Sequence, residues 1–447
     1  MLYTRALTAC IFVLGLAQAS CGADAVDNAA KTASKSAQGG SKAQAPAANG
    51  ATADWPQWRG PQRDAISRET KLLEQWPEGG PKLLWTNRGL GRGYSSPSVV
   101  GDRLYVLGTA DNTAAAIAVD LNSGEQLWVA KLGEQYENNW GGGPRGSVTV
   151  DGDRLYALDA VGNLFCLETE NGEKVWQKNL VSDFGGQIPN WGYCESPLVD
   201  GDKVVVTAGG PKCVVAFNKT SGDVIWTSTG LDEPAHYSSF IAANIDGVPL
   251  YVNQTSKGMV GVHADTGKLL WRYEKTGNGT ATIPTPIFHD GHVYGTSGYG
   301  TGCGLVKLTA AGSEVRADEV YFSKDMKNHH GGVVLKDGHI YGYSDGGGWL
   351  CQNFMTGEVV WRDRDAHGKG SVIYADDRLY CYSENEGALV LAEPSTEGWK
   401  EHGRFTIPET TKLERGSGKI WAHPVVSHGK LLLRDQDLLF CFDIQEQ

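Results

Sequence analysis

The sequence is poor in basic residues and in methionine. Lys and Arg number 40 against 52 Asp and Glu, which gives a formal net charge of -12. Affinity for phosphate backbones and for anionic lipid surfaces comes mainly from Lys and Arg, so this deficit argues against a nucleic-acid or membrane-surface binder. Met occurs four times, whereas Gly (59) and Trp (14) are abundant, a mix typical of many short strands joined by tight turns.

Closely spaced cysteines are also missing. No two of the seven cysteines beyond residue 53 are adjacent or in CxxC spacing, so the signatures of zinc, thioredoxin-like and c-type haem sites are lacking. No Ser/His/Asp arrangement, phosphate-binding loop or carboxylate pair stands out either. At least one thiol is unpaired because the number is odd, and the pairing of the others stays open: Cys166, Cys194, Cys213, Cys303, Cys351, Cys381 and Cys441.

The first residues resemble a secretory signal. Arg5 precedes an apolar stretch, residues 6–17, and small residues follow it. The apolar stretch is too short for a standard membrane-spanning helix. We therefore assign residues 1–20 to a signal peptide and expect the protein to be exported.

Two processing routes remain open. Ala-Gln-Ala at 17–19 suits ordinary signal cleavage, whereas Ser-Cys-Gly at 20–22 resembles a bacterial lipobox in which Cys21 is lipidated. Gln18 departs from the aliphatic residue usual in a lipobox. Residues 21–53 are rich in Ala, Ser, Gly and Lys and indicate a disordered tether. Because a tether behind an acylated cysteine makes mechanical sense, we favour the lipoprotein, anchored to the outer membrane.

An apolar run, a Gly/Asp turn and a second apolar run recur along the chain. One copy reads "SPSVVGDRLYVLG" at 96–108. Neighbouring turns lie 39 to 52 residues apart, a period that fits four strands per propeller blade. The eight turns are at Gly101, Gly152, Gly201, Gly247, Gly291, Gly338, Asp377 and Gly429.

A second frame lies between these turns. "AVDLNSGEQLW" (118–128) has a small residue first, a Gly seventh and a Trp eleventh. The Gly supplies the positive φ of a tight turn, and the small residue leaves room for an indole to pack flat. A cysteine in the first position is then a packing residue. The frame recurs at 166–176, 216–226, 261–271 and 351–361.

The frame also predicts how the ring closes. The last copy, with Cys441 first, stops before its Trp strand, while "PKLLWTNRG" (81–89) has the Trp strand, with Trp85, and nothing before it. We predict an all-β, eight-bladed propeller of four-stranded antiparallel blades over residues 54–447. Its last blade is closed by the N-terminal strand, residues 82–88, which removes two exposed sheet edges.

Two blades depart from the frame. "KLTAAGSEVRADEVYF" (307–322) has Arg316 where Trp is expected, and "LVLAEPSTEGWKEHGRF" (389–405) has lost the spacing. We expect these outer strands to pair irregularly or to present a different surface.

The frame and the eightfold closure resemble the quinoprotein dehydrogenase-like propeller superfamily over about residues 82–447. That resemblance implies the propeller fold and leaves function open. The superfamily includes alcohol and sugar dehydrogenases that use calcium and pyrroloquinoline quinone. It also includes the non-catalytic propeller lipoprotein of the bacterial outer-membrane barrel-assembly machinery. The opening "DWPQWRGPQRDAIS" (54–67) is similar to that of many exported bacterial propellers.

The enzymatic branch can be compared with this sequence. Those alcohol dehydrogenases commonly carry adjacent cysteines beside the quinone, and no Cys-Cys pair exists here. Their calcium ligands (Glu, Asn and Asp) find no matching motif, and no CxxCH haem attachment is present. We therefore name no catalytic or metal-binding residue.

Any functional site should lie at the central funnel, which is formed by the loops that enter each innermost strand. These loops carry aromatic, imidazole and basic residues that suit a planar or anionic ligand, or a peptide. Structural roles, such as capping the barrel, compete for every one of them. The candidates are Tyr94, Trp140, Arg145, Trp191, Tyr193, Glu195, His236, Tyr237, His329, His330, Lys369, Trp421 and His423.

The adjacent pair His329 and His330 suggests a metal site only at first sight. Neighbouring residues of an extended strand point to opposite faces, so both cannot readily bind one ion. We expect one imidazole to face the channel and the other to be packed.

The leading hypothesis is an exported, non-catalytic binding or scaffold propeller of the cell envelope, with a role in outer-membrane protein assembly and a protein or peptide partner. It would need no cofactor. One alternative is a periplasmic alcohol or sugar dehydrogenase that uses pyrroloquinoline quinone and calcium. Another is a carbohydrate-binding propeller, because the funnel tryptophans could stack on sugar rings.

Overall fold

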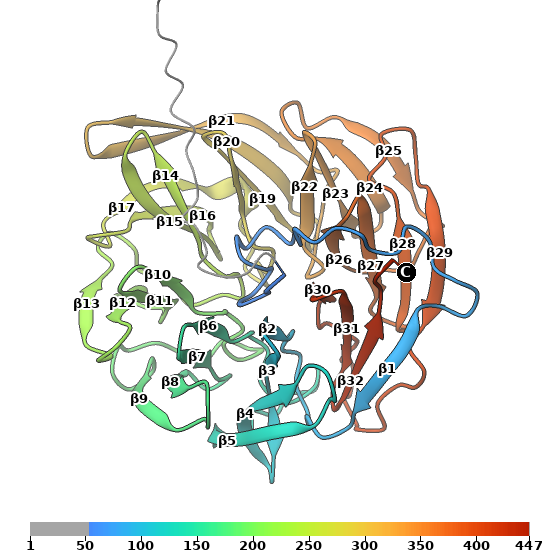
Figure 1. The fold of residues 1–447 in the computed structure, drawn as a ribbon. Coiled ribbons are helices and arrows are strands. Elements are labelled where there is room, and N and C mark those ends of the chain that lie inside the picture. The colour runs from blue at the N-terminus through green and yellow to red at the C-terminus, as the bar shows by residue number, and fades with distance from the viewer. Residues whose placement is uncertain (1–52, 447) are drawn as a thin grey trace, which may run out of the picture. The chain divides into compact units, whose positions relative to one another are not determined.

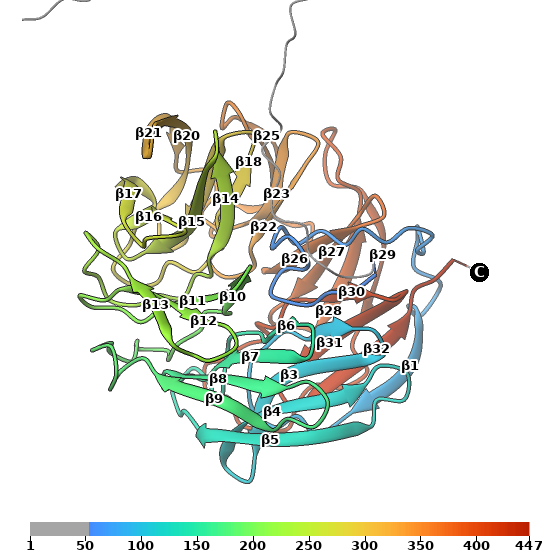
Figure 2. The same cartoon turned by 60° about the vertical axis from the view of Figure 1, so that its left-hand side comes forward.

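The computed structural model describes residues 53–446, which form eight four-stranded antiparallel sheets and one short 3-10 helix, η1 (Glu274–Thr276). The sheets surround a central axis (Figure 1), and Figure 2 shows them from a second direction. The predicted eight-bladed propeller is confirmed. The predicted signal peptide (1–20), Cys21 and the tether up to residue 52 lie outside the described residues. Within 53–446, no helix has the length and apolar character needed to cross a membrane.

Each blade consists of four strands in sequence order from the axis outwards, except the last blade. Blade 1 comprises β2 (Ser98–Val100), β3 (Arg103–Ala110), β4 (Thr113–Asp120) and β5 (Gln126–Glu134), and blade 2 comprises β6 (Thr149–Asp151), β7 (Arg154–Leu158), β8 (Asn163–Glu168) and β9 (Lys174–Asn179). Blade 3 comprises β10 (Leu198–Asp200), β11 (Lys203–Thr207), β12 (Val214–Asn218) and β13 (Val224–Thr227), and blade 4 comprises β14 (Ile241–Ile245), β15 (Val248–Thr255), β16 (Gly258–His263) and β17 (Leu269–Tyr273). Blade 5 comprises β18 (Ile287–His289), β19 (His292–Ser297), β20 (Gly302–Ala311) and β21 (Glu314–Ser323), and blade 6 comprises β22 (Val333–Lys336), β23 (His339–Ser344), β24 (Gly348–Asn353) and β25 (Val359–Asp363). Blade 7 comprises β26 (Gly370–Ala375), β27 (Arg378–Ser383), β28 (Ala388–Ala392) and β29 (Glu401–Thr406). Blade 8 comprises β30 (Val425–Ser427), β31 (Lys430–Asp435) and β32 (Leu438–Asp443), with β1 (Lys82–Asn87) as its outermost strand.

The eight predicted turns each join the two innermost strands of a blade. In blade 1, Val100 pairs with Arg103 across Gly101, whose φ is 60°. Asp377 adopts the same left-handed conformation, with φ of 56°, which Asp tolerates better than most residues. The repeat therefore marks the inner hairpin of every blade.

The first and eleventh positions of the Trp frame are cross-strand neighbours. Ala118 pairs with Trp128 in blade 1, and a β-bulge follows directly, so that Leu127 has no partner and is exposed. The small residue and the indole thus lie opposite each other on the two outer strands. The other pairs are Cys166 with Trp176, Ala216 with Trp226, Gly261 with Trp271, Cys351 with Trp361, and Cys441 with Trp85.

For four of these six indoles, Trp85, Trp128, Trp176 and Trp226, the other face lies on the turn glycine of the next blade. A Cβ on Gly172 would be 2.7 Å from the Trp128 ring, so only glycine leaves room there. The Trp128 Nε1–H donates to the carbonyl of Thr169, 3.1 Å away, in the same turn. Trp176 repeats this arrangement on Gly222, with a hydrogen bond of 2.9 Å to the carbonyl of Lys219. The frame therefore joins blades as well as strands.

Blade 5 keeps the contact with a different residue. Tyr321, not a residue at the position of Arg316, pairs with Leu305 and packs on Gly357 of blade 6. Its hydroxyl donates to the carbonyl of Phe354, 3.0 Å away. Of the two alternatives expected for this blade, irregular pairing does not occur, because β20 and β21 pair along nearly their whole length with one register shift, as regular blade 2 also has. Because the β20–β21 hairpin is longer than in the other blades, the docking residue lies five positions after Arg316.

Blade 7 departs further from the frame. Val390 pairs with Arg404, so no aromatic ring occupies the docking position. A register shift between Val390 and Ala392 shows the irregular pairing that the lost spacing predicts. Trp361 of blade 6 still donates its Nε1–H to the carbonyl of Ser395 in this blade, 2.7 Å away.

The N-terminal strand closes the ring as predicted. β1 lies beside β32, with Lys82 opposite Asp443, and ends at Asn87, one residue before the predicted limit. Trp85 then docks on blade 1, donating to the carbonyl of Leu121 at 3.0 Å. One strand therefore completes blade 8 and ties it to blade 1.

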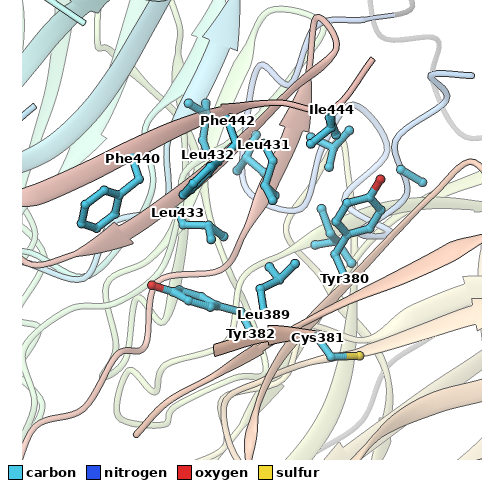
Figure 3. Packing of buried hydrophobic residues seen from close by; sticks show 14 of the residues in the cluster. Tyr380, Cys381, Tyr382, Leu389, Leu431, Leu432, Leu433, Phe440, Phe442 and Ile444 are labelled. Carbon is cyan, nitrogen blue, oxygen red and sulfur yellow. The ribbon is translucent and has the colours of Figure 1, made fainter. Parts of the chain in front are cut away.

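Apolar side chains fill the spaces between blades. One buried cluster extends over blades 1, 6, 7 and 8, and Figure 3 shows its part at blades 7 and 8, where Leu389 points toward Leu431 and Leu433. Aliphatic and aromatic residues of neighbouring blades interlock there: Tyr380, Tyr382 and Leu389 of blade 7 with Leu431, Leu433, Phe442 and Ile444 of blade 8. The cysteines that the structure describes are all free thiols, and six of the seven are buried, as packing residues should be.

The first part of the segment before β1 lies at the centre of the ring, and the blue trace then runs outward past β29 to β1 (Figure 1). We call residues 53–67 the N-terminal plug. Its backbone bonds to two inner strands in β-like fashion, since Trp55 exchanges both hydrogen bonds with Val99 and Ser67 donates to the carbonyl of Tyr374. Backbone and side-chain hydrogen bonds together connect the plug to every blade, either at the inner strand or at the residues just before that strand. The bonded residues are Val99, Thr149, Val150, Ser196, Pro197, Phe240, Thr285, Val333, Tyr374 and Ser427.

Two buried arginines hold the plug in place. Arg63 donates to the carbonyls of Ser196 and Phe240, at 3.1 and 2.9 Å, and so joins blades 3 and 4. Arg59 donates to the carbonyl of Val333 of blade 6, 2.6 Å away. Burial lowers the pKa of Arg63 to about 9 and that of Arg59 to about 10, so both remain charged at neutral pH. The sequence did not predict this segment's position.

We predict that Gly222→Ala destabilises the propeller by roughly 2–5 kcal/mol. A Cβ at this position would lie 2.8 Å from the Trp176 ring, and the backbone has φ of 74°. Gly201→Ala is the matched control in the same blade, because φ is 59° and the space around its Cβ is open. Gly201→Ala should lower the free energy of unfolding only by the strain of a left-handed backbone, roughly 1–2 kcal/mol. Urea unfolding measures both, and equal losses would refute the docking role of the turn glycine.

We predict that Arg63→Met lowers the free energy of unfolding by roughly 3 kcal/mol or more. The change leaves buried carbonyl groups of blades 3 and 4 without a donor. Arg68→Met is the control, because Arg68 is exposed and its ion pair with Asp64 contributes less than about 1 kcal/mol. If the two variants unfold at the same denaturant concentration, the plug does not stabilise the ring.

Candidate functional site

A cavity of about 470 Å³ lies where the chain enters the innermost strands. Its lining comes from the segments before the inner strands of all blades but the seventh, with Trp58 of the plug and Tyr299 of the β19–β20 turn. We call it the funnel cavity. Nine of the thirteen predicted site residues line it: Tyr94, Trp140, Arg145, Trp191, Tyr237, His329, His330, Trp421 and His423.

Aromatic and imidazole rings follow one another along one wall of the funnel cavity. The centroids of Tyr94 and Trp421 are 5.0 Å apart, and those of Trp421 and His330 are 5.3 Å apart. His330 then lies 4.5 Å from His329, which is 4.7 Å from Tyr299. Five rings from blades 1, 8, 6 and 5 therefore make a continuous surface.

A second group of rings completes the lining. Trp191 and Tyr237 meet edge to face, with centroids 5.4 Å apart. Trp58 of the plug lies 4.6 Å from His423, and its Nε1–H donates to the hydroxyl of Thr285 at 2.9 Å. The plug therefore contributes a wall of the cavity as well as stability.

Arg145 is the one cationic side chain among the cavity-lining residues. Its guanidinium lies over the Tyr94 ring at 4.6 Å and over Trp421 at 5.7 Å, a cation–π arrangement. Nη2 donates to the carbonyl of Gly141, 2.7 Å away. Gly141 has φ of 94° and passes so close to the Tyr94 hydroxyl that a Cβ would clash. The glycine-rich loop is thereby fixed around the arginine.

His329 takes part in a hydrogen-bonded relay behind the cavity wall. Nδ1 accepts from the Lys369 ammonium at 2.8 Å, so Nε2–H donates to the hydroxyl of Tyr299, also at 2.8 Å. Lys369 is in turn paired with Asp345 at 2.7 Å. Burial, with His330 and Lys369 close by, lowers the pKa of His329 to about 2. The imidazole is therefore neutral at physiological pH.

The expectation that one imidazole of the pair faces the channel and the other is packed is wrong. Both His329 and His330 line the cavity. They precede β22 in a segment that is not a strand, so the alternation of an extended strand does not apply. His330 Nε2 lies 2.9 Å from Glu384, which also accepts from Trp421 Nε1. Burial lowers the pKa of His330 although Glu384 opposes the shift.

His423 is held in one tautomer. Nε2–H donates to the carbonyl of His330, 2.9 Å away, which leaves Nδ1 as the acceptor. Burial and the neighbouring Arg59 lower its pKa to about 3. A neutral imidazole is therefore what this position presents.

Four predicted site residues do not line the cavity. Tyr193 and Glu195 point away from it because Cys194 and Ser196, their neighbours in the extended chain, take the cavity side. Tyr193 donates to the carbonyl of Ala208, while Glu195 accepts from the Thr207 amide, and burial raises the pKa of Glu195 to about 7.

The other two lie behind the lining. His236 accepts the backbone N–H of Thr282 at 3.1 Å, and burial lowers its pKa to about 4. The Lys369 ammonium donates to His329 in the relay described above. Lys369 bonds to the lining His329, and His236 lies beside the lining Tyr237, with ring centroids 5.3 Å apart, but neither lines the cavity.

The sequence reasoning missed two aromatic lining residues. Trp58 lies in "DWPQWRG", a segment outside the repeats, so the repeat pattern gives it no position in the ring. Tyr299 lies between two glycines in "SGYGTG", with φ of 55°, a sign of a tight turn that carries an exposed ring. Neither residue belongs to a loop that enters an inner strand.

The residues present do not fit a site for calcium and pyrroloquinoline quinone. Calcium requires oxygen ligands, whereas the lining side chains offer three imidazoles, one guanidinium and no carboxylate. Glu384, an acid behind the wall, is bonded to His330 and Trp421. Over residues 53–446, no cluster of three His, Cys, Asp or Glu side chains is placed to hold a metal ion.

Comparisons with known proteins agree with the architecture. A family model described as "Outer membrane protein assembly factor BamB" matches residues 115–363. The assembly factor BamB of Burkholderia pseudomallei is 23% identical over 385 residues, which cover 84% of this chain and 91% of that protein.

Two solved structures have the same fold. BamB of Moraxella catarrhalis superposes with a TM-score of 0.58 at 14% identity, covering 82% of this chain and 98% of that one. Quinohemoprotein alcohol dehydrogenase of Comamonas testosteroni gives 0.59 at 12% identity, covering 89% and 82%. At these identities the likeness concerns the fold alone, and it does not distinguish an assembly factor from an oxidoreductase.

We predict that His329 makes the stability of the propeller pH-dependent below neutrality. Its pKa is about 2 in the folded protein and 6.5 ordinarily, so only the unfolded chain takes up the proton between these values. The contribution is present above pH 6.5 and is lost as the pH falls, by up to roughly 1.4 kcal/mol per pH unit.

Urea unfolding of the parent chain and of His329→Gln between pH 7.5 and 5 tests this prediction. The parent should lose more stability than the variant over this range. The raised pKa of Glu195 acts in the opposite direction, but it is common to both proteins and cancels in the difference. His289→Gln is the control, because that side chain is 52% exposed. Parallel profiles for the parent and His329→Gln would contradict the prediction.

Proposed function

The chain belongs to the family described as outer membrane protein assembly factor BamB, and we propose on that basis that it is an exported, non-catalytic scaffold propeller in outer-membrane protein assembly. The observation that carries the proposal is the extent of the match. The family model spans more than half of the chain, and the alignment with the Burkholderia relative covers 84% of this chain and 91% of that protein.

The chemistry of the funnel cavity supports a non-catalytic role. The three lining imidazoles are neutral, and two of them are committed to hydrogen bonds with Lys369, Tyr299 and the His330 carbonyl. The two carboxylates beside these imidazoles are also engaged, Glu384 with His330 and Trp421 and Asp345 with Lys369. No lining side chain is arranged as a nucleophile with an adjacent base. This arrangement argues against the quinone-dependent dehydrogenase alternative.

The proposal includes location and partner. A signal peptide at 1–20, a lipid on Cys21 and a tether up to residue 53 would hold the propeller at the outer membrane, facing the periplasm. We propose a protein component of the assembly machinery as its partner. The rigid ring, fixed by docked tryptophans and by the plug, is suited to presenting loops to such a partner.

The proposal predicts that deleting the gene in its host lowers the amount of folded β-barrel protein in the outer membrane. Heat-modifiable migration of barrel proteins in gels, with quantitative proteomics of outer-membrane fractions, measures the effect. The wild-type gene should restore the level. The control is Arg316→Gln, a change of an exposed residue on β21, which should restore it equally well.

Two results would contradict the proposal. One is an unchanged level of folded barrel proteins in the deletion strain. The other is turnover by the purified protein, detected as dye reduction with alcohols or sugars after addition of pyrroloquinoline quinone and calcium. The second result would favour the dehydrogenase alternative.

A further inference from the structure

The funnel cavity has the dimensions of a small-molecule site. About 470 Å³ is within the range in which proteins hold single small ligands. The scaffold role does not need such a cavity, and the loops around it are fixed by buried contacts such as the hydrogen bond from the Tyr94 hydroxyl to the Trp140 carbonyl. The lining itself indicates which chemistry the cavity accepts.

The charge of the lining favours an anionic ligand. Among the described residues, no carboxylate lies within ion-pair distance of Arg145, and no acidic side chain lines the cavity. Boxes of aromatic rings often bind cations, but here the arginine already covers the faces of Tyr94 and Trp421. A second cation would meet an uncompensated positive charge. A carboxylate would neutralise it.

The tryptophans at the cavity favour a ring-shaped ligand. Trp140 lines the cavity and is nevertheless 45% exposed, so part of its ring is free for a partner. Trp191 is also partly exposed beside Tyr237. Both planar aromatic rings and the apolar faces of pyranose rings pack on indole, so the tryptophans alone do not separate these two ligand types.

The polar groups of the lining distinguish a pyranose ligand from a planar aromatic one. The Tyr299 hydroxyl accepts from His329, which leaves its own proton free to donate. Neutral His330 donates from Nε2 to Glu384, which leaves Nδ1 as an acceptor. The exposed Thr280 adds a further hydroxyl. Donors and acceptors side by side suit the several hydroxyl groups of a sugar better than an aromatic body.

We propose that the funnel cavity binds a carboxylated pyranose, such as the uronic acid unit of an acidic glycan. The carboxylate pairs with Arg145, the ring packs on Trp140, and ring hydroxyls bond to Tyr299 and His330. This binding activity goes beyond the assembly role. It is measured on the purified protein, so its failure would leave the proposed function standing.

The experiment compares three probes, D-glucuronate, D-glucose and benzoate, by isothermal titration calorimetry and ligand-observed NMR. Glucuronate should bind at least fivefold more tightly than either glucose or benzoate. Its affinity should fall with rising ionic strength, while that of glucose should not. Benzoate that binds as well as glucuronate, glucose that binds as well, or no detectable binding of glucuronate would each overturn the proposal.

Variants locate the site. Arg145→Gln should reduce glucuronate affinity about tenfold, to the level of glucose, and Trp140→Ala should weaken glucuronate and glucose alike. Arg316→Gln and Leu127→Ala are the matched controls, since Arg316 is exposed on β21 and Leu127 is as exposed as Trp140. Unchanged affinity in Arg145→Gln would overturn the proposal. If that variant fails to fold, the salt dependence of the parent protein decides.

Discussion

The propeller depends on one contact, an aromatic ring held between a small residue of its own blade and the turn glycine of the next. Trp128 shows the arrangement, with Ala118 across the strand pair and Gly172 beneath the ring. Because the indole N–H also bonds to the neighbouring turn, the ring fixes the distance and the angle between two blades. Trp85 on the closing strand extends the same contact from blade 8 to blade 1. The same contact therefore links blade 8 through blade 4, and Tyr321 on Gly357 links blades 5 and 6.

A different interaction fixes the centre. The N-terminal plug donates and accepts hydrogen bonds at inner strands whose edges face the axis and have no further strand to pair with. Arg63 and Arg59 satisfy carbonyl groups there that would otherwise be buried without donors. The same segment places Trp58 against His423 in the funnel cavity. The plug thus links the stability of the ring to the shape of its candidate site.

The sequence predicted the blades, the inner turns and the closing strand, because each depends on local spacing. It failed where spacing changes within a blade, as at Tyr321, which docks five residues beyond Arg316 on a longer hairpin. It predicted the loops that form the funnel cavity in all blades but the seventh, and nine of the lining side chains, but not the direction of the side chains around Cys194. Tyr193 and Glu195 alternate with Cys194 and Ser196, and only the register of the chain against blade 3 decides which pair faces the cavity.

By itself the sequence determined the ring, because small residue, glycine and tryptophan recur at fixed intervals and encode contacts between neighbouring strands. Only the tertiary structure decided what lies at the centre. The plug reaches eight inner strands that are far apart in the chain, and a repeat of local spacings carries no information about such contacts. The same holds for the relay from Lys369 through His329 to Tyr299, which joins three blades. Burial is what lowers the pKa of His329, and burial is a property of the assembled ring.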